Sequence, residues 1–155
     1  MAAGNTYTPI ATNTLVSATA SVSFASIPNT YTDLIWVIQG TCTANNIIAL
    51  RFNDTWSGIG GYNYYNGSSA LSYNNTNAYL QAGNPTDRFH IVGFINNYAN
   101  TTTYKTFFAR TNTPSSSLGT YIGTQKSTSA ITKITFDASN FASGTIFTLY
   151  GVTAA

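Results

Sequence analysis

The sequence predicts an all-β protein, an antiparallel β-sandwich. Thr, Val, Ile, Tyr and Phe recur in short runs separated by Gly, Asn, Ser and Pro, which is typical of strands joined by turns. Glutamate is absent and Lys and Leu are scarce, so no stretch combines helical periodicity with good helix formers. The chain of 155 residues is 43% hydrophobic, which fits one domain with a sizeable core.

The N-terminal segment, residues 1–13, is expected to be an extended arm outside the core. It contains turn formers and little apolar material, so it has few side chains to bury. An arm of this kind can cross onto a partner, and its candidate contacts are Asn5, Tyr7, Pro9 and Ile10. The domain proper is expected over residues 14–155.

The first half of the domain is expected to hold five strands, at residues 15–25, 33–40, 47–53, 62–66 and 78–82. Apolar and polar residues alternate at 21–24 and 48–52, which predicts strands with one buried face. The run 34–38 is apolar on both faces and is expected in the middle of a sheet or under a subunit interface. Turn residues at Pro28-Asn29 and the glycines at 58–61 separate these strands.

The second half is expected to hold five more strands, at residues 88–95, 104–110, 121–126, 131–137 and 145–152. Each is rich in β-branched and aromatic residues and is bounded by Gly, Pro, Asn or Ser. Two segments rich in Asn, Ser and Thr, 66–77 and 111–120, are expected to be long exposed loops.

Charge is scarce, at 6% of residues against about 25% in ordinary soluble domains. A surface of 26 Thr, 17 Asn and 15 Ser takes its place. The six cations form no cluster along the sequence, which argues against a nucleic-acid partner. No apolar run approaches the ~20 residues that span a membrane, and no signal peptide is recognisable. The single Cys42 allows no intrachain disulfide, is expected to be buried, and fits synthesis in a host cytoplasm.

The inventory of chemical groups predicts that the protein is not an enzyme and has no cofactor or metal. It contains four Asp, no Glu and a single His90, which is expected on a strand, facing either solvent or a hydrogen-bond partner. The Asp87 and His90 side chains should point to opposite faces of an extended segment. No catalytic, cofactor-binding or metal-binding residue is therefore predicted.

Aromatic residues near glycine and asparagine leave one binding function open. Trp56, Tyr62, Tyr64 and Tyr65 are candidate ligand or receptor contacts, because a ring face beside amides suits carbohydrate. The alternative is that these rings pack in the core or between subunits.

Four segments carry a resemblance to a known family: residues 27–34, 50–54, 64–68 and 141–152, which ends in Leu-Tyr-Gly-Val. They resemble the jelly-roll module of structural proteins of tailed bacteriophages, including cyanobacterial phages, over most of residues 20–152. The resemblance implies an antiparallel sandwich of jelly-roll type. The stretch 56–61 departs from the family in being bulkier than its usual short turn.

The resemblance implies a virion structural protein on the exterior of the capsid. The first interpretation is a capsid cement or decoration protein, a homotrimer that binds the major capsid protein of the assembled head and stabilises it. Trp36 and Tyr98 are then expected among the trimer contacts. The second interpretation is a tail-fibre or spike module that binds a surface glycan as receptor. The third is a lectin outside any virus.

Overall fold

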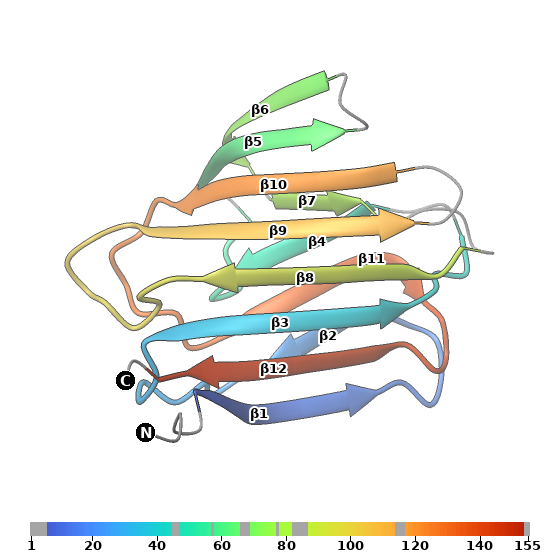
Figure 1. Ribbon diagram of the computed structural model, residues 1–155, viewed down its shortest axis with the longest axis horizontal. Helices are drawn as coiled ribbons and strands as arrows, with labels where there is room; N and C mark the ends of the chain where they lie inside the picture. The colour runs from blue at the N-terminus through green and yellow to red at the C-terminus, as the bar shows by residue number, and fades with distance from the viewer. Residues whose placement is uncertain are drawn as a thin grey trace.

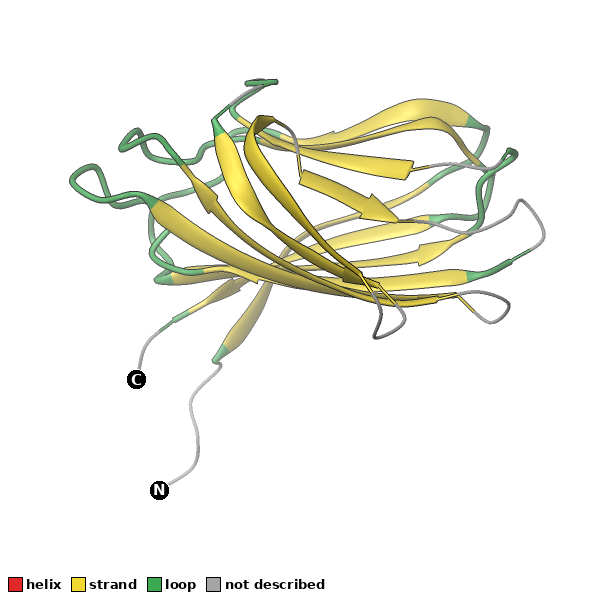
Figure 2. Ribbon diagram, turned by 90° about the horizontal axis from the view of Figure 1, so that it is seen from above, coloured by secondary structure: helices red, strands yellow, loops and turns green. Residues whose placement is uncertain are grey.

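Twelve antiparallel strands form two stacked sheets in the computed structural model (Figures 1 and 2), which describes residues 6–44, 47–56, 58–65, 69–76, 78–81, 87–113 and 117–153. The eight-stranded sheet has the order β1 (Tyr7–Thr14), β12 (Ile146–Val152), β3 (Asp33–Gly40), β8 (Phe89–Ile95), β9 (Lys105–Thr113), β10 (Ser117–Gln125), β5 (Ile59–Tyr65) and β6 (Ser69–Thr76). The four-stranded sheet has the order β2 (Thr19–Phe24), β11 (Ile134–Phe141), β4 (Ile47–Phe52) and β7 (Ala78–Gln81). Within these residues, no helix has the length and apolar character needed to cross a membrane.

The strand pairing is that of a jelly roll with two inserted hairpins. Antiparallel pairs join β1 with β12, β2 with β11, β3 with β8 and β4 with β7, which is one long hairpin folded over into two sheets. The β5–β6 hairpin is inserted between β4 and β7, and the β9–β10 hairpin between β8 and β11. Both hairpins add to the same sheet, which explains why one sheet has eight strands and the other four.

The core lies between the sheets and is built from alternate residues of each strand. In β3, Leu34, Trp36 and Ile38 are fully buried while their neighbours point outward. Aromatic rings link the two sheets. The centre of the Phe136 ring on β11 lies 6.1 Å from that of Trp36 and 5.9 Å from that of Phe147 on β12. The predicted all-β sandwich is thus confirmed, and residues 33–40 form a strand with the predicted bounds.

Strands occur in three segments that the sequence assigned to loops or to the arm. Residues 7–14, of which 7–13 were expected in an arm outside the core, form the edge strand β1, paired with β12. Within the expected loop 66–77, residues 69–76 form the other edge strand, β6. Likewise, β9 and β10 extend into the expected loop 111–120. Polar side chains favoured a loop, but an edge strand needs only one neighbour and can face water on both sides.

A further correction concerns the trimer contacts expected from two aromatic residues. Trp36 and Tyr98 are both completely buried inside one chain, so neither is available to a second copy. The Tyr98 hydroxyl donates a hydrogen bond to the Pro28 carbonyl. Cys42 is buried, as the sequence predicted.

Candidate functional site

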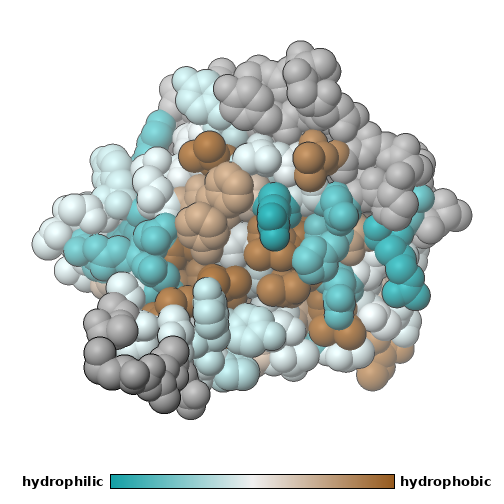
Figure 3. All heavy atoms as spheres, viewed as in Figure 1, coloured by the Kyte–Doolittle hydropathy of each residue, from teal (hydrophilic) through white to brown (hydrophobic). Residues whose placement is uncertain are grey.

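An apolar row crosses the outward face of the eight-stranded sheet. Cross-strand pairing aligns seven residues on seven neighbouring strands: Pro9, Tyr150, Ile35, Phe94, Phe108, Ile122 and Tyr62. Three of them are large and well exposed, with 58% of Tyr62, 50% of Ile122 and 38% of Phe94 accessible. The Phe94 and Phe108 rings stack at 5.4 Å. Figure 3 views this face and shows hydrophobic atoms gathered at its centre.

A polar row crosses the same face four residues further along the strands. Pairing aligns Thr14, Ile146, Gln39, His90, Asn112 and Leu118 on β1, β12, β3, β8, β9 and β10. Four residues of an extended strand separate this row from the apolar row by about 13 Å. One further row, which includes Val92 and Arg110, lies between them on the same face.

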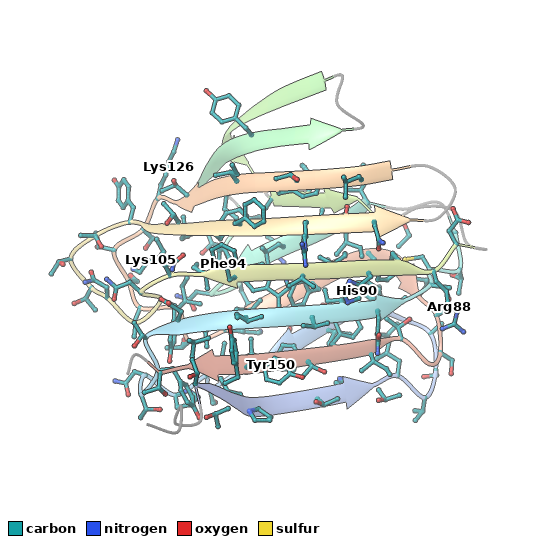
Figure 4. The ribbon with its side chains drawn as sticks, in the orientation of Figure 1. Arg88, His90, Phe94, Lys105, Lys126 and Tyr150 are labelled. Atoms are coloured by element: carbon teal, nitrogen blue, oxygen red, sulfur yellow. The ribbon has the colours of Figure 1, made fainter. Side chains whose placement is uncertain are left out.

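Two shallow depressions lie along the polar row, with His90 lining both. One is about 210 Å³ in volume and is lined by His90, Arg110, Thr111, Asn112 and Leu118. The other is about 280 Å³ and is lined by Gln39, Gly40, Arg88, Phe89, His90, Gly144 and Ile146. We call the two depressions together the groove; Figure 4 labels Arg88 and His90 within it and Phe94 on the apolar row.

The groove is rich in hydrogen-bond donors, and the described residues that line it include no carboxylate. Arg88, His90 and Arg110 are exposed. Within the described residues, the ion pairs join other side chains and include neither guanidinium. Asp87 precedes Arg88 in the chain but lines neither depression. These groups are therefore available to an anion.

The opposite sheet carries a neutral ion-pair network instead. Arg51 donates to Asp137 at 2.9 Å, and Lys133 donates to Asp54 at 2.7 Å. The hydrogen bond to Asp137 raises the pKa of Arg51, and the hydrogen bond from Lys133 lowers the pKa of Asp54. Two cations and two anions compensate one another here, so this surface offers little attraction to a charged ligand.

The predicted ligand contacts fall on different surfaces. Trp56 is 55% exposed, and the Arg51 guanidinium lies 4.1 Å from its ring centre, so one face of the indole is occupied. Tyr62 belongs to the apolar row on the eight-stranded sheet. The backbones of Tyr64 and Tyr65 are in β5, but their side chains lie outside the described part of the chain.

The predicted arm contacts lie on or before β1. Asn5 is outside the described residues. Tyr7 is 61% exposed and Pro9 is exposed, while Ile10 is half-buried and packs against the core. Tyr7 and Pro9 are therefore accessible to a partner along this edge of the sheet.

Sequence reasoning missed the groove. The signal that could have been used is the alternation Arg88, His90, Val92, Phe94, because alternate residues of a strand share one face. His90 is exposed on β8, as predicted. Arg110 joins them only through the register between β8 and β9, which no local pattern contains. Among the described residues, no group of three His, Cys, Asp or Glu side chains could hold a metal ion.

Comparison with known proteins assigns no family. No protein-family model matches the sequence, and no curated protein matches it. A galectin of Caenorhabditis elegans, LEC-6, is 9% identical with a TM-score of 0.35, and the match covers 98% of this chain and 99% of the galectin. A human SPRY domain is 12% identical with a TM-score of 0.31, covering 88% and 87% respectively. The marine PL-14 alginate lyase from Aplysia kurodai is 11% identical with a TM-score of 0.34, covering 81% of this chain and 70% of the lyase. These likenesses concern the sandwich architecture alone.

Proposed function

We propose that this protein is a non-enzymatic binding module of a virion surface, a capsid cement or decoration protein. In this proposal a homotrimer sits on the exterior of the assembled head and contacts the major capsid protein. The single observation that carries it is the apolar row, because a free monomer rarely exposes so continuous an apolar surface. We assign the apolar row to the contact between copies of the chain.

The size of the face supports that assignment. Seven strands about 4.8 Å apart span about 34 Å, and three rows of side chains about 6.7 Å apart cover about 20 Å. Their product, about 680 Å², lies within the ~600–1,000 Å² that each partner contributes to a standard interface. Three rows centred on the apolar row are therefore enough for a stable contact. One of these rows contains Arg110, which pairs with Val92 two residues along β8 from Phe94, so the contact reaches the near side of the groove.

The edge strand β1 supports the contact with the capsid. Its outer edge pairs with no other strand among the described residues, so backbone donors and acceptors are available there to a neighbouring chain. Tyr7 and Pro9 add exposed side chains at the same edge. A protein that binds only the assembled shell stabilises that shell by mass action, and many copies multiply the effect.

The test is binding of the purified chain to expanded heads of the phage whose genome encodes it. We expect attachment at a stoichiometry related to the major capsid protein, and a higher melting temperature of the head. Light scattering should give three times the chain mass for the wild type and a monomer for Phe94→Ser. No attachment at saturating protein, or a gene that belongs to no phage, would overturn the proposal; a wild-type monomer at all concentrations would remove the trimer.

A second candidate function is a tail-fibre or spike module that binds a surface glycan. The observation in its favour is that Trp56 and Tyr62 are each more than half exposed, on two different surfaces. Glycan binding that is lost in Trp56→Ala or in Tyr62→Ala supports it and identifies the surface, and Tyr104→Ala is the matched control, because Tyr104 is also 59% exposed. Binding unchanged in both variants would remove these residues. A copy number of a few dozen per virion would move the protein from the head to the tail.

A further inference from the structure

We propose that the groove on the eight-stranded sheet is a binding site for an acidic saccharide. The juxtaposition that carries this inference is the meeting of Arg88, His90 and Arg110 on one face, with the amides of Gln39 and Asn112 beside them. The groove borders the apolar row at Arg110, and the proposal does not rest on the virion function.

The charge of the groove selects an anion. Arg88 lines one depression and Arg110 the other, and His90 lies between them. No lining residue is acidic, whereas the acids Asp54 and Asp137 on the other sheet are neutralised by their own cations. A guanidinium forms paired hydrogen bonds with a carboxylate or a sulfate, which gives such a ligand both energy and orientation.

The shape of the groove selects an extended ligand. The polar row from Ile146 to Leu118 crosses five strands, so four strand spacings give a length of about 19 Å. Both depressions are open and shallow, unlike the enclosed pockets that bury most of a small ligand. A polymer lying across the strands can reach both depressions at once.

The remaining lining groups suit sugar rings. The Gln39 and Asn112 amides each offer donors and acceptors, which match hydroxyl groups that do both. Leu118, which is 65% exposed, and Ile146 supply apolar contacts at opposite ends of the groove. Two cations beside these neutral amides favour a chain that offers hydroxyl groups as well as acidic groups, as an acidic saccharide does.

The experiment is titration calorimetry of the full chain with two matched pairs of saccharides. Oligogalacturonate is compared with its methyl ester, and a dextran sulfate oligomer with dextran, so that each acidic saccharide is tested against a neutral counterpart. We expect at least one acidic saccharide to bind and neither neutral counterpart to bind. Whichever pair responds identifies carboxylate or sulfate as the acidic group.

Variants locate the site. Arg88→Gln and Arg110→Gln each remove one charge from an exposed side chain and should weaken binding at least about tenfold. Lys126→Gln removes the same charge from an exposed residue that does not line the groove and should change affinity less than about twofold. Phe94→Ser on the apolar row should bind like the wild type. Thermal melts of each variant confirm that it is folded.

Three results would overturn the proposal. The first is the absence of binding to either acidic oligomer. The second is an equal loss of affinity in Lys126→Gln, which would assign the attraction to net charge. The third is stronger binding of a single-stranded oligonucleotide or of inorganic phosphate than of the acidic saccharide, which would identify a different ligand.

Discussion

Replacing Lys105 with methionine tests how the connection between the two sheets is held. Lys105 is at the start of β9, points into the protein and is 1% exposed. Its ammonium donates to the carbonyls of Ser127 at 3.2 Å and Ser129 at 2.6 Å, in the segment that leads from β10 to β11. The ion pairs found within the described residues do not include it. Methionine retains the length of the side chain and removes both hydrogen bonds.

The expected magnitude is the balance of two opposing terms. Hydrogen bonds from a charged donor contribute about 1.5–3 kcal/mol each, so two are worth about 3–6 kcal/mol. Burial of an ammonium without a carboxylate costs several kcal/mol, and methionine does not incur this cost. Ser129 is exposed and its carbonyl can be rehydrated in the variant. We therefore expect Lys105→Met to lower the free energy of unfolding at pH 7 by about 1–2 kcal/mol, or the melting temperature by ~2–8 °C.

The pH dependence gives a second readout. Burial lowers the pKa of Lys105 from the ordinary value of 10.5. The folded state then binds the proton less tightly than the unfolded chain, so stability rises with pH between the lowered pKa and 10.5. The variant lacks this contribution. The difference in stability between wild type and variant should therefore widen as pH increases through that window.

Urea denaturation of both proteins at several pH values up to about 10 measures the two effects. Lys126→Met is the matched control, because it removes an exposed lysine close to the same connection and should change stability by less than about 0.5 kcal/mol. A variant as stable as the wild type at pH 7, with the same slope against pH, would refute the reasoning. It would mean that the two carbonyl contacts do not hold the connection.

Three further predictions concern other packing and hydrogen-bonding features. Gly93→Ala should destabilise by about 1–3 kcal/mol in urea denaturation, since the new Cβ would lie 2.3 Å from the Trp36 ring; no loss would mean that the ring can move aside. Tyr98→Phe should cost about 1–2 kcal/mol at pH 7 by leaving the Pro28 carbonyl without its donor. Burial raises the pKa of Tyr98, so the contribution of this residue to stability is present below pH 10 and is lost as pH rises through its pKa in the folded state. The melting temperature of Tyr98→Phe should therefore fall less steeply at alkaline pH than that of the wild type, and identical profiles would contradict this role of Tyr98. Asn53→Ala should lower the free energy of unfolding by about 2–3 kcal/mol, because the Asn53 side chain forms hydrogen bonds with three backbone groups of residues 130–133. Asn53→Asp should lower it less because it retains the acceptor oxygen, and equal losses in the two variants would argue against these hydrogen bonds as the cause.

The sequence predicted strands where apolar residues mark a core face, and it missed strands whose sequence is mostly polar. Residues 33–40 were predicted with their true bounds because the run 34–38 is apolar. Apolar runs of this kind are typical of strands in the middle of a sheet, where β3 lies. Residues 7–14 and 69–76 are edge strands held by backbone hydrogen bonds to one neighbour. Backbone pairing leaves no mark in composition, so polar sequences of this kind are predicted as loops.

The site was harder to predict than the fold, for a physical reason. Alternation along residues 88–94 reveals which side chains of one strand share a face. Whether Arg110 meets His90 depends on the register between strands, and a shift of one residue would turn Arg110 to the core. Trp36 illustrates the converse error: a large aromatic residue was expected at an interface, but the facing sheet covers it completely.

The two inserted hairpins give the outward face its binding character. The eight strands that remain without them would form an ordinary jelly roll with four strands in each sheet. β5, β9 and β10 supply Tyr62, Phe108 and Ile122 of the apolar row. They also supply Arg110 to the groove, together with Asn112 and Leu118. The folded hairpin of the jelly roll provides most of the core. The insertions widen one sheet and carry three of the seven residues of the apolar row and four of the eleven described residues that line the groove. Function on this scaffold is therefore to be sought on the insertions, and variants of β9 and β10 should change binding while the core pairs β3–β8 and β4–β7 remain intact.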